Sequence, residues 1–344
     1  MGKRAAKHNT GNLSRPPSGG CPPAELLDEY RLCLQAENKS PKTISWYLDI
    51  LTRYFTFLKS RRLLKPIGQM GTVELRAYLL HLQQADRWSG HPNIGQGKGP
   101  LSPFSIQGHA RAVKAFWGWL EREGHVETNR LARFPLPRVP VKPVDILTTD
   151  QLRQLLVQID RMTPNGARYF LIILLLIDTG LRISELASIT LANIDLAQSG
   201  IRVLGKGQKV RFVPLSPETR REISRFLKAS RPRLSPPQSQ YLFATPDGNA
   251  IAVNSVQQYL RRLGRNAGLE GVRVTPHVLR HSFASAYIAN GGNPFTLKEI
   301  LGHSTLAMTM RYVHLQPSDL QAQHAMFSPV AKSGLLRRSA RSQA

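Results

Sequence analysis

Apolar residues recur at helical spacing along most of the chain and follow a strand-like pattern only near its middle. Between residues 22 and 132, four segments carry the helical pattern, at residues 24–36, 40–58, 72–84 and 102–124. The second and fourth begin with Ser40-Pro41 and Ser102-Pro103, where a hydroxyl can cap the helix and proline fits its first position. We therefore predict four helices that bury their apolar faces in one core.

The second half of the chain combines helices with a single strand pair. Thr148 to Gln151 forms a capping box ahead of an amphipathic segment, and residues 169–177 are apolar on every side, as in a buried helix. Residues 201–204 and 210–215 are rich in strand-forming residues and flank a glycine-containing turn, which predicts an antiparallel hairpin. Further helices are expected at residues 254–266, 276–289, 304–312 and 318–327. The predicted fold class is mainly α with a small antiparallel β-sheet.

A proline-rich segment separates the two halves. Prolines at positions 135, 137, 140 and 143 disfavour both helix and sheet, and such a chain extends by about 3.1 Å per residue. We predict an interdomain linker at residues 133–147, between a helical domain at 22–132 and a second domain at 148–328. Residues 1–21 are basic with almost no apolar content and are expected to be a disordered tail. Residues 329–344 form a second basic tail.

Positive charge is spread over the whole chain, with a net charge of +25 and an isoelectric point near 10.8. The excess of Lys and Arg over Asp and Glu is +11 in residues 1–145 and +14 in residues 146–344. Two basic halves favour double-stranded DNA gripped from two sides over a neutral enzyme with a basic tail. The side chains expected near DNA lie on polar helix faces or in the hairpin turn: Lys42, Arg111, Lys114, Lys209, Arg261 and Arg262. For the last two, a merely solvated helix face is the alternative.

The cysteine content and the length of the apolar runs indicate in which cellular compartment the protein is expected. The two cysteines, Cys21 and Cys33, support neither a disulfide framework nor a cysteine-type zinc site. The longest apolar run, residues 169–177, is too short to span a bilayer, and the first residues lack the apolar core of a signal peptide. We expect a protein of the cytoplasm, associated with the nucleoid and not with a membrane.

Reactive side chains are concentrated in residues 275–314. His277 and Arg280 lie three apart on one predicted helix and share a face, and His303 and Tyr312 follow after a glycine turn. A phenol is only about a thousandth ionised at pH 7, a deficit of roughly 4 kcal/mol that a histidine base and fixed cations offset. Guanidinium groups bind phosphate oxygens through paired hydrogen bonds. The stretch suits attack by tyrosine on a phosphodiester, and it lacks the carboxylate cluster of a two-metal nuclease.

These residues stand in the order of known sequence boxes. HVLRH at 277–281, LGH at 301–303 and the tyrosine nine residues later resemble the carboxy-terminal boxes of the tyrosine recombinase (integrase) family, closest to its Xer-like branch. TGLRISEL around Arg182 resembles the family's first arginine box, and GKGQKVRFVPL resembles its hairpin box, with the matching lysine at Lys206. The resemblance covers about residues 24–325. It implies a two-domain DNA clamp, with a helical core-binding domain and a mixed α/β catalytic domain.

The resemblance also implies a mechanism of site-specific recombination. Tyr312 would form a 3′-phosphotyrosine bond and free a 5′-hydroxyl, which attacks the partner duplex. Arg182, Arg280 and His303 would hold the phosphate, and His277 would act as the base. Because the phosphotyrosine bond conserves the energy of the phosphodiester bond that is cleaved, no ATP, metal or other cofactor is required.

Two further roles follow from the same resemblance. Lys206 would protonate the leaving group, with Lys209 as the local competitor for that role. Subunits would form a homotetramer on synapsed DNA sites by exchanging a carboxy-terminal segment that includes residues 318–327. A second recombinase or an accessory protein is a possible additional partner.

Other interpretations of the same residues remain open. His277 and His281 have the spacing of zinc ligands, with His303 as a third, although Arg280 between them would oppose a dication. A type IB topoisomerase uses similar chemistry on one duplex, and a non-catalytic DNA-binding protein is the rival from another class. The loop expected at residues 86–99 and the basic amino-terminal tail depart from the compact Xer pattern. They leave chromosome-dimer resolution and mobile-element integration as alternatives.

Overall fold

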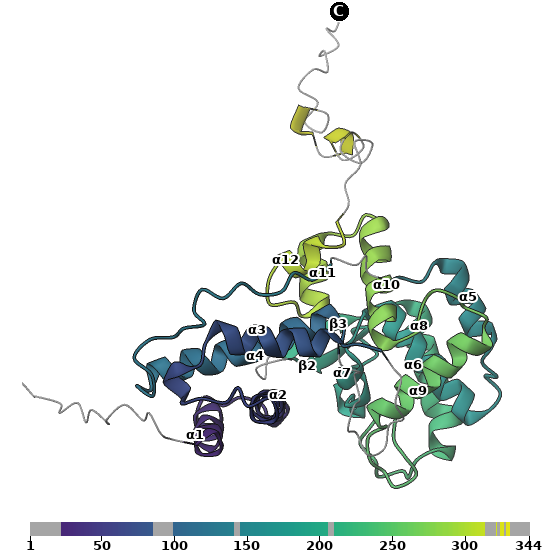
Figure 1. Cartoon of the computed structure of the whole chain (residues 1–344). Coiled ribbons are helices and arrows are strands. Elements are labelled where there is room, and N and C mark those ends of the chain that lie inside the picture. The colour runs from purple at the N-terminus through teal and green to yellow at the C-terminus, as the bar shows by residue number, and fades with distance from the viewer. Residues whose placement is uncertain are drawn as a thin grey trace, which may run out of the picture. The chain divides into compact units, whose positions relative to one another are not determined.

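The computed structural model describes residues 22–84, 99–140, 145–205 and 210–313, together with residues 321, 324–326 and 328–330. The chain divides into two compact units, residues 1–142 and residues 143–344 (Figure 1). The expected amino-terminal tail, the tip of the hairpin and most of the two carboxy-terminal segments lie outside the described residues. The domain boundaries given above therefore stay predictions.

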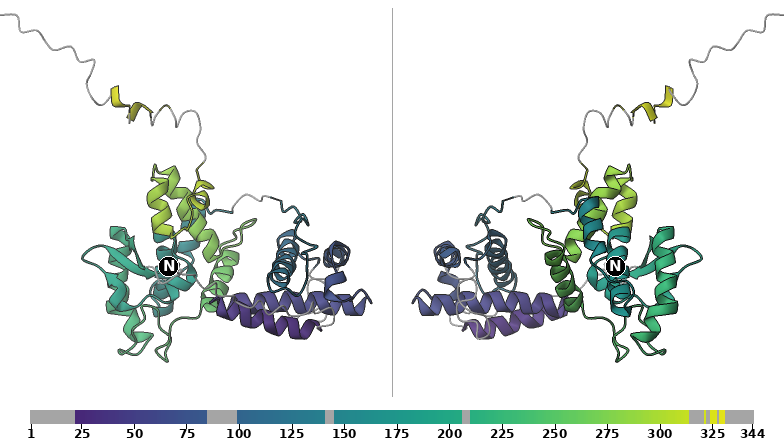
Figure 2. Two further views of the ribbon diagram at one scale, coloured as in Figure 1. Left: turned by 90° about the vertical axis from the view of Figure 1, so that its left-hand side faces the viewer. Right: turned by 90° about the vertical axis from the view of Figure 1, so that its right-hand side faces the viewer.

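The first unit is a bundle of helices. Its elements are α1 (Pro23–Ala36), α2 (Pro41–Ser60), a 3₁₀ turn η1 (Ile67–Gln69), α3 (Thr72–Gln84) and α4 (Pro103–Arg122). The predicted caps are confirmed, since the hydroxyls of Ser40 and Ser102 each accept a backbone N–H three residues on, at 3.2 Å. The α1–α2 pair runs across the α3–α4 pair (Figures 1 and 2), and rings such as those of Tyr54, Phe116 and Trp117 fill the buried centre.

The start of the proline-rich segment packs against α4. Leu131 and Phe134 are buried in the core of the first unit. The Lys114 ammonium donates to the carbonyls of Ala132 and Phe134, at 3.1 and 2.6 Å. The segment from Pro135 to Pro140 has neither helix nor strand, as its prolines predict. The beginning of the predicted linker is therefore anchored on the helical unit.

The second unit is built around one buried helix. Its helices are α5 (Thr149–Val157), α6 (Pro164–Thr179), α7 (Ile183–Ala187), η2 (Leu191–Asn193), α8 (Pro217–Arg225), η3 (Phe226–Ser230), η4 (Arg231–Arg233), α9 (Val253–Asn266), α10 (Pro276–Ala289), α11 (Pro294–Leu301) and α12 (Ala307–Met310). The capping box of α5 is confirmed, with both reciprocal hydrogen bonds present. As the apolar run predicts, α6 lies in the core, packed against α8 and α10.

The sheet is small and antiparallel. Strands β1 (Ile194–Asp195), β2 (Gly200–Leu204) and β3 (Val210–Pro214) lie in the order β1-β2-β3. Val203 pairs with Arg211 and Ile201 with Val213, so Arg211 shares a strand face with buried Val213. The predicted hairpin is confirmed, and so is the mainly α fold with a small antiparallel sheet.

The last three helices and the turns that follow them carry most of the residues of the expected site. Thr275 caps α10 as predicted, accepting the N–H of Val278 at 3.2 Å. The helix ends at Ala289, with Asn290 as its C-cap residue before Gly291, whose φ is +84°. One prediction is wrong: Tyr312 does not lie on the short helix, because α12 ends at Met310. The N–H of Tyr312 bonds to the carbonyl of Thr309 at 3.0 Å. The chain thus closes three-residue turns instead of continuing the α-helical ladder.

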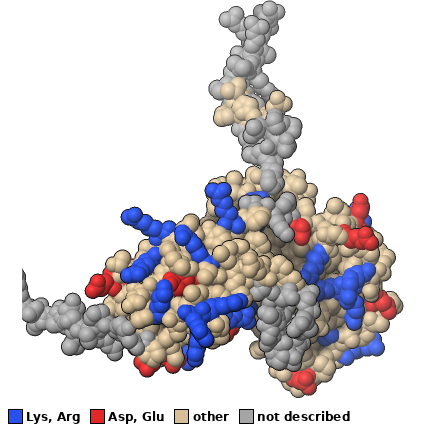
Figure 3. Space-filling view, viewed as in Figure 1, with Lys and Arg blue, Asp and Glu red and all other residues tan. Residues whose placement is uncertain are grey.

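In the part of the chain that the structure describes, no helix is both long and apolar enough to cross a membrane. Lys and Arg side chains appear on both units in Figure 3, in keeping with the basic charge of both halves of the sequence.

Candidate active site

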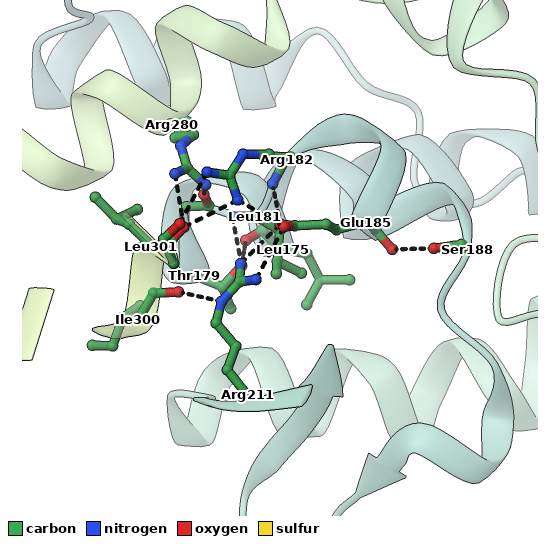
Figure 4. A network of polar contacts seen from close by, with 12 residues as sticks. Leu175, Thr179, Leu181, Arg182, Glu185, Ser188, Arg211, Arg280, Ile300 and Leu301 are labelled. Atoms are coloured by element: carbon green, nitrogen blue, oxygen red, sulfur yellow. Dashed lines mark hydrogen bonds and ion pairs between the residues drawn. The ribbon is translucent and has the colours of Figure 1, made fainter. Parts of the chain in front are cut away.

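Two arginines converge on the carboxy-terminal end of α11. The side chain of Arg280, 5% exposed, donates to the carbonyl of Gly180 at 2.6 Å and to that of Leu301 at 2.8 Å. Arg182, immediately before α7, donates to the carbonyl of Gly302 at 3.1 Å. The last carbonyls of a helix have no partner within it, so they are free to accept these bonds. Figure 4 shows the guanidinium groups side by side.

A third arginine and one carboxylate complete this cluster. Arg211 donates from both terminal nitrogens to the two oxygens of Glu185, at 3.0 and 2.8 Å, and from Nε to the carbonyl of Ile300 at 2.9 Å (Figure 4). The same carboxylate accepts from the side chain of Arg182 at 2.9 Å and from its backbone N–H at 2.8 Å. Burial acts to raise the pKa of Glu185, but these hydrogen bonds outweigh it and hold the pKa below its usual value.

The arginine cluster keeps an excess of positive charge. Burial, followed by the neighbouring Arg182, lowers the pKa of Arg280 to about 10, so this side chain stays charged at neutral pH. In the described structure Glu185 is the one carboxylate paired with this cluster, and it bonds to Arg182 and Arg211, whereas Arg280 bonds only to carbonyls. It leaves two positive charges without a negative partner, which is the electrostatic condition for binding a phosphate.

His303 lies at the edge of this cluster. It follows Gly302, which ends α11 in the left-handed conformation with φ +64°. Its Nδ1 shares a hydrogen bond with the hydroxyl of Thr309 at 2.9 Å. Burial, followed by the charge of Arg280, lowers the pKa of His303 to about 4, so the ring is neutral at pH 7.

Tyr312 and two histidines form a hydrogen-bonded chain. The Tyr312 hydroxyl bonds to Nδ1 of His281, and Nε2 of His281 bonds to Nε2 of His277 at 2.8 Å. The Tyr312 side chain is 6% exposed and packs against Leu297 and Leu301. Burial raises the pKa of Tyr312, although nearby arginines oppose this effect. The histidine that touches the phenol is therefore His281, and His277 lies one step further away.

The structure describes most of the residues that the sequence singles out. Arg182, Arg280 and His303 lie together around the end of α11, and Tyr312 reaches His277 through His281. Lys206 and Lys209 lie outside the described residues. In the first unit Lys42 and Arg111 are exposed, whereas Lys114 is tied to the segment after α4. Arg261 and Arg262 are exposed on α9, the latter over the ring of Tyr259.

Sequence reasoning missed three residues of this site. The sequence singles out His281 only as a candidate zinc ligand, although its position four residues after His277 places both rings on one helix face. Arg211 alternates with buried Val213 on β3, and an arginine on an inward strand face needs an acidic partner. Glu185 stands three residues after Arg182, on the same side of a helix start. Among the described residues, no group of three or more His, Cys, Asp or Glu side chains is arranged to hold a metal ion.

Two family profiles match the sequence. The profile described as "Phage integrase family" matches residues 145–319, and the one described as "Phage integrase, N-terminal SAM-like domain" matches residues 26–92. The first of these matches covers about half of the chain and includes every residue of the site described above.

Curated relatives extend the similarity. The tyrosine recombinase XerC of Oceanobacillus iheyensis is 29% identical over 309 residues, which are 89% of this chain and 96% of the relative. The tyrosine recombinase XerD of Lacticaseibacillus casei is 33% identical over 222 residues, which are 64% of this chain and 75% of the relative.

Solved structures share the fold. The Tn1549 transposon integrase in complex with transposon right end DNA has a TM-score of 0.68 at 22% identity, covering 88% of this chain and 99% of that one. The recombinase XerH bound to difH substrate has a TM-score of 0.65 at 22% identity, covering 89% and 85%.

The fold and the site define an enzyme that breaks and rejoins DNA in site-specific recombination through a tyrosine intermediate. The chain belongs to the phage integrase family, and its similarity to XerC and XerD places it among the Xer-like tyrosine recombinases.

Proposed function

We propose that Tyr312 is the nucleophile and that Arg182, Arg280 and His303 bind the phosphate it attacks. One observation carries the proposal: a buried phenol, hydrogen-bonded to a histidine pair, shares an electrostatic environment with an arginine cluster of excess positive charge. Arg280 acts to lower the pKa of both Tyr312 and His303. A charged site held by fixed carbonyls and Glu185 is already organised for the negative charge of a pentavalent phosphate.

The proton balance of the reaction needs a base and an acid. The phenol loses a proton as it attacks, and the 5′-oxygen of the leaving strand gains one. The histidine pair is the base, with His277 as the member that reaches solvent. Lys206, in the hairpin between β2 and β3, is the proposed acid. A leaving group in which sulfur replaces the 5′-oxygen needs no proton, so it should rescue Lys206→Ala and not Arg182→Ala.

The partner is double-stranded DNA, held by both units. The charge of the two halves supports this clamp, as do relatives that are described as bound to DNA. We place the reaction in the cytoplasm, on a homotetramer formed by exchange of the carboxy-terminal segment. Truncation after Val313 should then leave DNA binding by single subunits nearly intact while removing strand exchange. A truncated protein that still assembles in fours and exchanges strands would refute the exchange.

The experiment that tests the function begins in cells. The chain is expressed, protein-bound DNA is captured under denaturing conditions, and the attached DNA ends are sequenced to define the site. Tyr312→Phe should bind this site and form no covalent adduct. Tyr287→Phe, a partly buried tyrosine on α10, is the matched control and should form the adduct. An adduct from Tyr312→Phe would overturn the assignment, and relaxation of supercoiled DNA without strand exchange would favour a topoisomerase.

A further inference from the structure

We propose that His281 is a further catalytic residue, which takes the proton of the Tyr312 hydroxyl at Nδ1 and passes a proton from Nε2 to His277. The inference rests on the proposed function, because it requires Tyr312 to be the nucleophile. It assigns the first proton transfer to a ring that bonds to the reacting oxygen directly. His277 then acts as the second acceptor of the pair.

The geometry of the chain supports a route for the proton. Tyr312 and His281 are each 6% exposed, whereas His277 is exposed. The hydrogen bonds run from the phenol to His281 and then, at 2.8 Å, to His277. Because His277 and His281 lie one turn apart on α10, the helix places the two rings next to each other on one face. A proton that leaves the buried phenol therefore reaches solvent through two imidazole rings.

The transfer balances in atoms and charge. The Oη–H bond of Tyr312 breaks as its oxygen forms the bond to phosphorus, and the proton goes to Nδ1 of His281. The proton on Nε2 of His281 moves to Nε2 of His277, which becomes an imidazolium and releases a proton from Nδ1 to solvent. His281 ends neutral with its proton on the other nitrogen. In the joining step the same bonds carry a proton back to the phenolate.

In the DNA-free protein the surroundings of His281 and Tyr312 disfavour this proton transfer. Burial, followed by the nearby His277, lowers the pKa of His281 to about 4, and burial raises that of Tyr312, so the proton stays on the phenol. The titratable and charged groups that face His281 are His277, Arg311, Arg280, His303 and Tyr312. A phosphate diester bound to the arginines adds negative charge, which opposes their effect and favours protonation of the histidines. Proton transfer is thereby coupled to bound DNA.

The alternative is a latch, in which His281 only holds Tyr312 buried until DNA releases it. The two interpretations predict opposite results when the hydrogen bond is kept and the relay is removed. In His281→Asn, the side-chain amide reaches the position of Nδ1 and can still bond to the phenol, but it cannot pass a proton onward. A relay predicts slower cleavage by this variant, and a latch predicts cleavage as fast as wild type or faster.

The test measures single-turnover cleavage of the recovered DNA site between pH 5.5 and 9.5. The substrate carries sulfur in place of the 5′-bridging oxygen, so the rate reports nucleophile activation and not leaving-group protonation. At pH 7 His281→Asn should cleave about 10²- to 10³-fold more slowly than wild type. Its rate should rise about tenfold per pH unit and approach the wild-type rate at high pH. Because both rings serve one transfer, His281→Asn combined with His277→Asn should be no slower than His281→Asn alone.

The chain supplies a matched control in its first unit. Nδ1 of His109 bonds to the hydroxyl of Tyr78 at 2.8 Å, and both side chains are buried. His109→Asn makes the same change in a histidine–tyrosine pair outside the site, and its pH profile should match wild type. Wild-type or faster cleavage by His281→Asn at pH 7 overturns the inference. If Tyr312→Phe still forms an adduct, it is the proposed function that fails instead.

A second measurement on the wild-type protein decides the matter if His281→Asn does not fold. Nitrogen-15 chemical shifts of the histidine rings identify which nitrogen carries the proton. The relay requires His281 to hold its proton on Nε2 and to accept at Nδ1 from Tyr312. Observation of this tautomer supports the relay, and the opposite tautomer overturns it.

Discussion

Arg211 and Glu185 form a two-pronged ion pair, with nitrogen–oxygen distances of 3.0 and 2.8 Å. The pair joins β3 to the beginning of α7, and the third bond of Arg211, to the carbonyl of Ile300, joins both to the end of α11. Arg182 shares the same carboxylate. Glu185 and Arg211 therefore link β3 to the two segments that carry Arg182 and His303.

Arg211→Lys should uncouple these segments while keeping the charge. A lysine ammonium cannot reproduce the planar fork of guanidinium bonds. The Glu185 carboxylate therefore loses hydrogen bonds, and Arg182, which it also binds, loses its fixed position. We expect cleavage to fall by about 10- to 100-fold in a single-turnover assay, with DNA affinity within about threefold of wild type. Arg202→Lys is the control, because Arg202 lies on β2 in a half-exposed pair with Asp195. Equal cleavage by the two variants would contradict the coupling.

Gly302→Ala should disturb the site through one contact. Gly302 and Gly268 both have φ +64°, a conformation that costs an alanine about 1–2 kcal/mol. A Cβ on Gly302 would lie 3.0 Å from Nη1 of Arg211, whereas a Cβ on Gly268 meets nothing within 4 Å. Both variants should lower the free energy of unfolding, measured by urea titration, by a similar strain cost. Only Gly302→Ala should also slow cleavage, and unaltered cleavage by it would show that Arg211 can shift without effect.

Local signals in the sequence were sufficient for most of the secondary structure. Ser40-Pro41, Ser102-Pro103 and Thr275-Pro276 each mark a helix start correctly, because a cap and its proline act within one turn of the chain. The hairpin followed from two strand-forming runs around a glycine turn. The end of α12 did not follow, since the position of Tyr312 depends on burial against Leu297 and Leu301.

The sequence identifies the residues of the site more readily than the contacts between them. The box resemblance named Arg182, Arg280, His303 and Tyr312, but the sequence does not state which histidine reaches the phenol. That choice depends on how the turn after α12 approaches α10, a long-range contact between residues 31 apart. The link between Arg211 and Glu185, 26 residues apart, is equally non-local. Alternation on β3 could have indicated that Arg211 points inward, without identifying its partner.

Lys42→Ala and Lys114→Ala should have different effects, the first on DNA binding and the second on stability. Lys42 is exposed near the start of α2, so Lys42→Ala should weaken DNA binding and reduce the slope of log affinity against log salt by about 0.9 if it contacts one phosphate. The Lys114 ammonium bonds to the carbonyls of Ala132 and Phe134. Lys114→Ala should therefore lower the stability of the first unit and change the salt slope little. A full slope change in Lys114→Ala would restore its predicted DNA contact.

The buried ring of His109 predicts that the stability of the first unit depends on pH, and tryptophan fluorescence can follow this stability. Burial lowers the pKa of His109 to about 4, compared with about 6.5 for an unfolded histidine. Between these values the unfolded chain binds more protons than the folded unit, so stability is retained above pH 6.5 and falls as pH decreases towards 4. The loss approaches about 1.4 kcal/mol per pH unit for one such group.

All four tryptophans of the sequence, at positions 46, 88, 117 and 119, belong to the first unit, so urea unfolding followed by their fluorescence reports this unit. His109→Asn removes the titrating ring, and its stability should depend less steeply on pH across that window. Parallel curves for the two proteins would show that protonation of His109 does not oppose folding.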